Sequence, residues 1–127
     1  MKLRVLILDD EATCRAIGRL LMARFDLAFV HRGDAALRLF AEGEAFGAVL
    51  CDLRLPDISG LIVFARAEAA YPEQAAGFIF HTGSPDLIPP DSKVPVLAKP
   101  CESAELFRVI DAVAARRLGA TNRELAP

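Results

Sequence analysis

The chain has 127 residues, of which 54% are hydrophobic and 25% charged, and its formal net charge is −2. A chain of this length and composition can bury a core of its own, which excludes an intrinsically disordered protein. The near balance of charge excludes the basic surface of a nucleic-acid-binding protein, and no apolar run approaches the ~20 residues of a membrane-spanning helix. Acidic residues at positions 9–11 follow the first apolar run before a signal-peptide core could form. We therefore expect one domain in the cytoplasm that binds neither nucleic acid nor membrane.

Short apolar runs alternate with segments of helical periodicity along the chain. The runs predicted as strands span residues 4–8, 27–30, 48–51, 78–81 and 94–98. The segments predicted as helices span residues 11–25, a short stretch between Gly33 and Gly43, residues 60–71, and residues 103–118 capped by Gly119. This alternation predicts an α/β fold, a doubly wound parallel sheet covered by helices on both faces.

One crossover departs from this alternation. Pro85, Pro89 and Pro90 lie between the fourth and fifth predicted strands. Proline fixes φ and removes a backbone donor, so we expect the fourth crossover helix to be short or missing. Residues after Gly119 are polar, and we predict a domain over residues 1–120 followed by a C-terminal tail over residues 121–127.

Polar side chains follow four of the five predicted strands. Asp9 and Asp10 follow the first strand, Asp52 the third, Thr82 the fourth and Lys99 the fifth. Ligands of open parallel sheets bind beyond the carboxyl ends of the strands. Each residue alone has an ordinary explanation as a cap, a loop residue or a solvated charge. Together they place three carboxylates near one another, and like charges at close range destabilise each other.

A divalent cation would relieve this repulsion. Hard oxygen ligands favour Mg²⁺, which takes one or two carboxylates, keeps several waters and engages a substrate phosphate. Asp10 and Asp52 are the best direct ligands, with Asp9 acting through water. Lys99 and Thr82 then supply donors for phosphate oxygens. Asp52 remains a candidate nucleophile, because aspartate can form an acyl phosphate.

Four short segments in this order are specific to one family: Asp9-Asp10-Glu11, residues 52–56 with Gly60, Thr82-Gly83-Ser84 and Lys99-Pro100. Over residues 3–118 the chain resembles the receiver domain of bacterial two-component response regulators. The resemblance implies a flavodoxin-like sheet of five strands in the order 2-1-3-4-5. It also implies that Asp52 accepts a phosphoryl group from a histidine kinase or histidine phosphotransfer protein.

The resemblance also assigns roles to the other residues. Asp9 and Asp10 would hold Mg²⁺ together with Asp52 and the backbone carbonyl of Arg54. Thr82 would contact the phosphoryl group and shift on activation, and Lys99 would bridge it. Such a protein catalyses only its own phosphorylation and dephosphorylation, and it signals by binding partners. A kinase would dock on the first helix near Cys14, Arg15 and Gly18 and on the loop at Pro100-Cys101.

Two features differ from the family pattern. The family usually has Tyr or Phe three residues before the lysine, whereas this chain has Val96. The path from Thr82 to Lys99 is also several residues shorter than usual. Both differences affect the usual output face, and neither affects the phosphorylation chemistry.

Other functions remain open from the sequence. An aspartyl-phosphate phosphohydrolase needs two aspartates separated by one residue after the first strand, but Glu11 occupies the second of these positions. A degenerate receiver that only binds partners would have lost a key residue, and none is missing. We expect a single-domain regulator, with a receiver fragment of a hybrid histidine kinase as the alternative, and a homodimer is left open.

The remaining reactive side chains are expected to be structural. Cys14, Cys51 and Cys101 are too widely separated for a disulfide framework or a zinc site, so buried thiols are predicted. His81 precedes Thr82 on the fourth strand and points to the opposite face, where we predict a packed and hydrogen-bonded core histidine.

Overall fold

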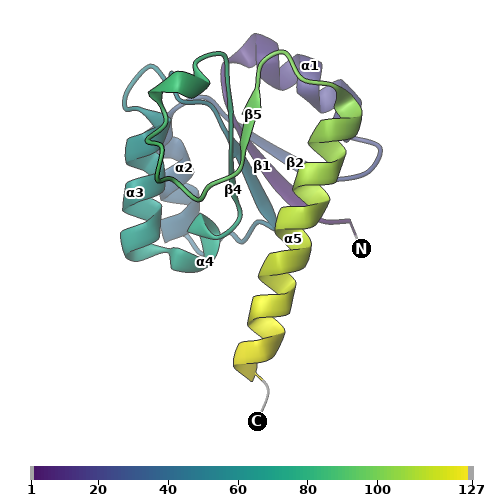
Figure 1. Ribbon diagram of the computed structural model, residues 1–127, viewed down its shortest axis with the longest axis vertical. Helices are drawn as coiled ribbons and strands as arrows, with labels where there is room; N and C mark the ends of the chain where they lie inside the picture. The colour runs from purple at the N-terminus through teal and green to yellow at the C-terminus, as the bar shows by residue number, and fades with distance from the viewer. Residues whose placement is uncertain (1, 126–127) are drawn as a thin grey trace.

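Five parallel strands form the centre of the molecule (Figure 1). The computed structural model describes residues 2–125. The strands are β1 (Arg4–Leu8), β2 (Asp26–Val30), β3 (Ala48–Cys51), β4 (Phe78–Thr82) and β5 (Val96–Ala98). They are ordered β2-β1-β3-β4-β5 across the sheet, which confirms the predicted α/β fold and strand order.

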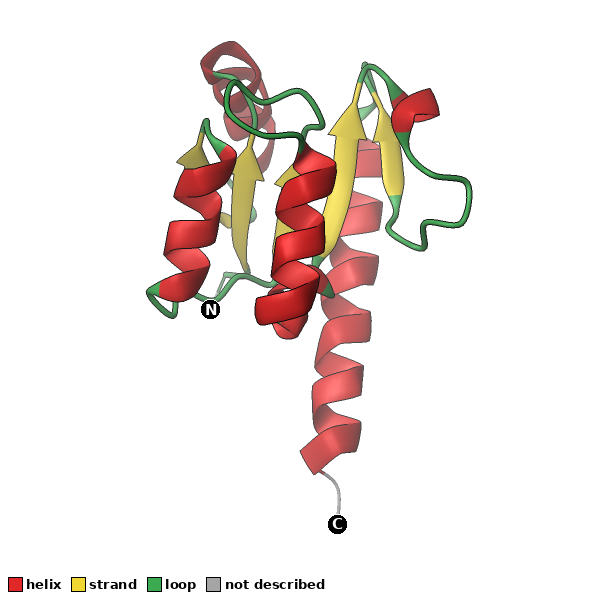
Figure 2. Ribbon diagram, turned by 90° about the vertical axis from the view of Figure 1, so that its left-hand side faces the viewer, coloured by secondary structure: helices red, strands yellow, loops and turns green. Residues whose placement is uncertain are grey.

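Helices cover both faces of the sheet (Figure 2). One face carries α1 (Glu11–Leu21) and α5 (Ser103–Leu125), and the other carries α2 (Gly33–Ala41), α3 (Gly60–Ala70) and the one-turn α4 (Pro72–Ala75). Within residues 2–125, no helix combines the length and apolarity needed to cross a bilayer.

The alternation of side chains along each strand explains why the apolar runs are continuous. Val5 and Ile7 of β1 point into the core beneath α1 and α5, whereas Leu6 and Leu8 point into the core beneath α2 and α3. All four side chains are fully buried. A parallel strand covered on both faces therefore needs apolar residues at every position rather than at every second one.

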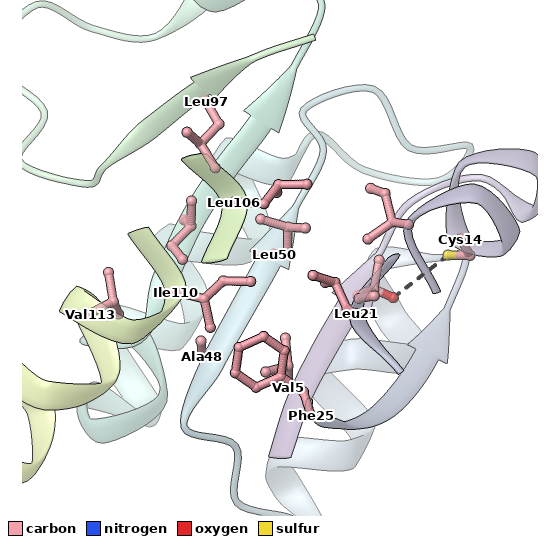
Figure 3. Packing of buried hydrophobic residues seen from close by; sticks show 13 residues of the cluster. Val5, Cys14, Leu21, Phe25, Ala48, Leu50, Leu97, Leu106, Ile110 and Val113 are labelled. Atoms are coloured by element: carbon pink, nitrogen blue, oxygen red, sulfur yellow. Dashed lines mark hydrogen bonds between the residues drawn. The ribbon is translucent and has the colours of Figure 1, made fainter. Parts of the chain in front are cut away.

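The core beneath α1 and α5 is mostly aliphatic, with the ring of Phe25 and the thiol of Cys14 among its members (Figure 3). Leu21 of α1 and Ile110 of α5 pack toward Leu50 of β3 between the two helices. The core on the opposite face is aromatic instead, with ring centroids 5.4 Å apart for Phe64 and Phe78. Edge-on ring contacts of this kind stabilise beyond the area that they bury. The two cores hold the sheet rigidly, which fixes the positions of the loops at its carboxyl end.

The crossover from β4 to β5 contains no α-helix. A single 3₁₀ turn, η1 (Pro85–Leu87), is followed by a loop that leads to β5, as Figure 2 shows beside the last two strands. The expectation of a short or missing helix is therefore confirmed. The strand after the loop begins at Val96 rather than at residue 94.

Two predicted helix ends were wrong, those of the first and last helices. The first helix ends at Leu21, although Phe25 after it is buried as expected. Helix α3 ends at Ala70, one residue before the predicted end, and Pro72 then begins α4, because proline is tolerated in the first helical turn. Helix α5 continues through Gly119 to Leu125, so residues 121–125 extend the helix. A helical glycine costs only about 1 kcal/mol relative to alanine, and by itself it does not end a helix.

Candidate functional site

Lys99 places its ammonium group between two carboxylates at the carboxyl end of the sheet. The Nζ atom lies 2.8 Å from Oδ2 of Asp9 and 3.4 Å from Oδ2 of Asp52. Both aspartates are buried, with exposures of 1% and 8%. Leu8 of β1 pairs with Cys51 of β3, so the next residues along each strand emerge side by side. The structure thus brings three of the predicted site residues into contact.

Backbone groups hold the two carboxylates in place. The N–H of Asp10 donates to Oδ1 of Asp9 at 2.8 Å, and the N–H of Leu53 donates to Oδ1 of Asp52 at 2.8 Å. The N–H of Asp52 donates to the carbonyl oxygen of Leu8 at 2.9 Å. In each carboxylate Oδ1 is therefore bound by the backbone, and Oδ2 is directed at Lys99.

The electrostatics of this group follow from its burial. Desolvation raises the pKa of Asp9 from 3.8 to about 6, the charge of Asp52 adds to this rise, and Lys99 opposes it. Burial lowers the pKa of Lys99, but its contacts with Asp9 and Asp52 outweigh this effect, and the pKa lies above its usual value. With both carboxylates ionised, the buried group carries two negative charges and one positive charge.

Asp10 is placed differently from the other two aspartates. Its side chain is exposed and caps α1, with Oδ1 accepting a hydrogen bond from the N–H of Thr13 at 2.7 Å. That hydrogen bond lowers the pKa of Asp10. Among the side chains that the structure describes, no three from acidic, histidine or cysteine residues form a group that could hold a metal ion. The expected crowding of three carboxylates is therefore reduced to two, because the third serves as a helix cap.

The side chains at this edge still fit Mg²⁺ in their donor chemistry. Two adjacent carboxylates offer hard oxygen atoms, and Mg²⁺ typically takes only one or two carboxylates and keeps several waters. The excess negative charge of Asp9 and Asp52 over Lys99 also favours a bound cation. Asp10 directly follows Asp9 and caps the start of α1, so it lies at the same edge of the sheet.

Thr82 and Arg54 complete the set of predicted residues. Thr82 ends β4 and is buried, and its Oγ1 accepts a hydrogen bond from the N–H of Ser84 at 3.0 Å. The N–H of Lys99 donates to the carbonyl oxygen of Thr82 at 2.8 Å, so the two residues lie side by side at the ends of the paired strands β4 and β5. Arg54 is exposed on the loop after β3. The hydroxyl hydrogen of Thr82 remains available for an acceptor at the site.

Several solved structures with the same fold are receiver domains. The signal receiver domain of an HD-domain-containing protein from Pseudomonas fluorescens Pf-5 matches with a TM-score of 0.85 and 24% identity, covering 96% of this chain and 93% of that chain. A CheY-like response regulator receiver domain from Methylobacillus flagellatus matches with a TM-score of 0.74 and 26% identity, covering 89% and 98%. The sequence matches no protein-family model and no curated protein.

This chain has the fold of a response-regulator receiver domain. A third match is the receiver domain of a sensor histidine kinase from Pseudomonas aeruginosa PAO1, with a magnesium ion coordinated in its active site cleft. It has a TM-score of 0.75 and 25% identity, and the match covers 91% of this chain and 99% of that chain. The resemblance noted from the sequence is thus confirmed for the fold.

Val96 stands where receiver domains usually have an aromatic residue. It is the first residue of β5, and its side chain is 40% exposed. Its Cα partner on β4 is Phe80, two residues before Thr82. A valine cannot swing between an inner and an outer position as an aromatic ring can, because its side chain is short and stiff at χ1.

Asp57 has a structural role that the sequence did not reveal. Its carboxylate lies in the loop between β3 and α3 and accepts hydrogen bonds from the N–H groups of Gly33 and Asp34, both at 2.9 Å. These groups begin α2, so Asp57 caps a helix that is more than twenty residues away in the chain. The loop that carries Asp52 is therefore tied to α2.

Replacing Asp57 by alanine is expected to lower the free energy of unfolding by about 1–2 kcal/mol at neutral pH. Desolvation raises the pKa of Asp57, but hydrogen bonds from Asp34 and Gly33 outweigh it and hold this pKa well below its usual range. The stabilisation is therefore complete above pH 3.8 and declines as the pH falls from there toward the folded-state pKa. Urea denaturation at a series of pH values tests this, and a difference that widened in acid would contradict it.

His81 is buried on the face of β4 that points toward α1 and α5. Its exposure is 5%, as predicted for a packed core residue, but its Nδ1 atom has no hydrogen-bond partner among the described residues. Desolvation, with a smaller effect from Lys99, lowers the pKa of His81 from 6.5 to about 4. The imidazole is therefore neutral at physiological pH. The prediction of a packed histidine is confirmed, but Nδ1 lacks the expected hydrogen bond among the described residues.

Replacing His81 by leucine is expected to raise the free energy of unfolding by about 1–3 kcal/mol at neutral pH, because it removes a buried polar atom without a partner. The gain should grow as the pH falls from 6.5 toward about 4, since only the unfolded wild type binds a proton in that interval. Thermal or urea denaturation near neutral pH and near pH 4.5 measures both effects. A gain that is the same at the two pH values would show that His81 is not buried in neutral form.

Proposed function

We propose that this chain is a phosphoacceptor receiver domain of a two-component or phosphorelay system, and that Asp52 accepts the phosphoryl group. The observation that carries this proposal is the position of the Lys99 ammonium between Oδ2 of Asp9 and Oδ2 of Asp52. A lysine at this place supplies a positive charge beside the attacking oxygen. The receiver-domain fold of the matched structures supports the same role.

The donor in this proposal is a phosphohistidine of a histidine kinase or a histidine phosphotransfer protein. A carboxylate oxygen of Asp52 attacks the phosphorus atom in line, the bond from phosphorus to the imidazole nitrogen breaks, and its electron pair stays on that nitrogen. Lys99 then pairs with a phosphoryl oxygen, and the Thr82 hydroxyl donates to another. The phosphoryl group leaves the donor histidine and becomes bonded to Asp52, and the phosphorylated chain then acts by binding partners.

Mg²⁺ is the cofactor that we propose for this step. Asp9 and Asp52 would hold it together with the backbone carbonyl of Arg54, and Asp10 would join them on releasing the N–H of Thr13. The ion would neutralise charge on the phosphoryl oxygens. The receiver domain from Pseudomonas aeruginosa, which has a magnesium ion in its active site cleft, supports this assignment. The two carboxylates are oriented by the chain itself, since backbone N–H groups donate to Oδ1 of Asp9 and to Oδ1 of Asp52.

A groove beside the site offers a place for the phosphoryl donor to dock. It has a volume of about 430 Å³ and is lined by residues of α1, β4, the loop after β5 and α5, namely Ala16, Ile17, Leu20, His81, Lys99, Pro100, Cys101 and Leu106. Leu20 is 48% exposed, which suits it to contact an apolar helix of a cytoplasmic kinase or phosphotransfer protein. We therefore propose docking on the Ala16 and Leu20 side of α1.

The expected kinase contact at Cys14 and Gly18 needs correction. Both residues are buried, and Gly18 faces β2, where a Cβ atom would lie 3.1 Å from Cζ of Phe29. Gly18 therefore makes room for the ring of Phe29 within the fold. Of the expected docking residues, only Pro100 and Cys101 line the groove described above.

Incubation with Mg²⁺ and a small acyl phosphate tests the proposed function by intact mass spectrometry. The wild type should gain one phosphoryl group, because receiver domains that catalyse their own phosphorylation need no partner for this step. The Asp52→Asn variant should gain none, and chelation of the metal should prevent the gain in the wild type. Equal gains by the wild type and the variant would show that the phosphoacceptor is another residue.

A further inference from the structure

A second groove, away from Lys99, lies between α1 and the edge strand β2. It has a volume of about 840 Å³, and the residues that matter here are Arg15 and Arg19 of α1, Met22 directly after that helix, and Leu27 and Phe29 of β2. Met22 and Phe29 are 62% and 44% exposed, which makes them two of the most exposed large apolar side chains among the described residues. An exposed apolar groove of this kind marks an interaction surface.

The position of Phe29 is set by the register of β2 and by α1. Phe29 and Leu27 pair with Ile7 and Val5 of β1, whose side chains point toward α1 and α5, so both residues point to the same face. Gly18 of α1 lies directly against the Phe29 ring. The ring thus rests on the helix backbone, and part of its surface remains open along the edge of the sheet.

The backbone of the same two residues is directed away from the sheet. Within the described residues, β2 is an edge strand that pairs only with β1. The N–H of Asp26 donates to Leu3, and the carbonyl of Val30 accepts from Asp9, so alternate residues of β2 starting at Asp26 face β1. In a parallel sheet the intervening residues, Leu27 and Phe29, then direct both N–H and C=O outward.

This edge has little protection against another strand. Natural sheets guard their edges with charged residues, prolines or bulges, but the only charged residue within β2 is Asp26 at its start. Asp26 itself pairs with Arg4 at 3.9 Å. The remainder of β2 is apolar, and it offers unpaired backbone groups beside exposed apolar side chains.

The charge around the groove is positive, although the chain as a whole carries a net charge of −2. Lys2, Arg4, Arg15 and Arg19 line the groove, and among its described lining residues only Asp26 is acidic. Arg4 is paired with Asp26 and, at 2.8 Å, with Glu44, so the excess positive charge comes from the other three. Arg15 pairs only with the exposed Glu11 at 3.0 Å, and Arg19 has no ion pair within residues 2–125. The groove therefore complements an acidic partner.

We propose that β2 accepts an extended acidic segment of a partner protein as an additional strand of the sheet. The segment would pair with the outward backbone groups of Leu27 and Phe29 and would place alternate apolar side chains against Phe29 and Met22. Its acidic residues would meet Arg15 and Arg19. Strand addition of this kind takes affinity from backbone hydrogen bonds and specificity from the pockets for alternate side chains. The surface is formed without Asp52 or Lys99, so it does not depend on the proposed phosphorylation.

Selection of short random peptides displayed on phage against the folded chain tests the pattern. Enriched peptides should carry apolar residues at every second position with Asp or Glu between them. Enrichment of basic peptides, of peptides with helical spacing, or of no common pattern would overturn the proposal. The same selection on the Arg19→Glu variant should lose the acidic preference.

Fluorescence anisotropy with one enriched peptide tests the geometry. Arg19→Glu should weaken binding by about tenfold or more, and added salt should reduce this difference, because charges at an exposed rim are screened. Arg66→Glu, a charge reversal on the exposed surface of α3, is the matched control and should leave binding unchanged. Methylation of the peptide amides in one alternate register should abolish binding, and in the other register it should be tolerated. Equal effects of both charge reversals, or tolerance of methylation in both registers, would contradict strand addition.

Discussion

Replacing Lys99 by methionine is expected to lower the rate of phosphorylation of Asp52 by about 10²- to 10³-fold, the usual effect of removing one preorganised positive donor. Methionine keeps most of the length of the side chain but leaves Oδ2 of Asp9 and Oδ2 of Asp52 without the ammonium group between them. The developing charge on the phosphoryl oxygens then loses its partner. Intact mass spectrometry over time, with acyl phosphate and Mg²⁺ in excess, gives the two rates.

The matched control for this variant is Lys93→Met. Lys93 is exposed in the loop before β5 and forms no ion pair among the described residues, so its replacement should change the rate less than about twofold. A urea denaturation curve for Lys99→Met establishes that the variant is folded. If the folded Lys99→Met variant reacted as fast as Lys93→Met, Lys99 would have no part in the chemistry.

Replacing Gly60 by alanine is expected to lower the free energy of unfolding by about 3 kcal/mol or more and to slow phosphorylation. A Cβ atom at Gly60 would lie 2.1 Å from the carbonyl oxygen of Asp52, and it would also press on Sγ of Cys51 at 3.0 Å. The nearest atom belongs to the backbone and cannot rotate away. The loop that positions the Asp52 carboxylate must therefore shift. Urea denaturation measures the loss of stability, and the rate of mass gain measures the effect on the site.

Gly83→Ala is the control for this prediction. No atom lies within 4 Å of a Cβ built at Gly83, which follows Thr82 at the same end of the sheet. Its replacement should change the free energy of unfolding by less than about 0.5 kcal/mol. Similar losses in the two variants would mean that contact with Asp52 is not the reason for glycine at position 60.

Much of the site could be predicted because its residues follow directly from strand ends. Once apolar runs and helices alternate, the sheet must be parallel, and Asp9, Asp52 and Lys99 must emerge at the same edge. The alternation of apolar runs and helical segments is sufficient to predict this shared edge. To predict that Lys99 contacts the two aspartates, one must also know the order of the strands in the sheet, and the family resemblance implied that order.

The features that could not be predicted depend on contacts between distant segments. Asp57 caps α2 from another loop, and nothing in its neighbours indicates that its carboxylate reaches Gly33. The position of Asp10 in the sequence is typical both of a metal ligand and of a helix cap. Its sequence neighbours do not show that its carboxylate accepts from the N–H of Thr13. The open groove at Phe29 arises only when β2 becomes an edge strand beside Gly18.

Locating the modified residue is the sharpest test of whether Asp52 is the phosphoacceptor. After reaction with acyl phosphate and Mg²⁺, borohydride reduces an aspartyl phosphate to homoserine, and peptide mass spectrometry identifies its position. We expect homoserine in place of Asp52, with Asp9 and Asp10 unmodified. Homoserine in place of Asp9 or Asp10, or no reduced residue in the wild type, would contradict it.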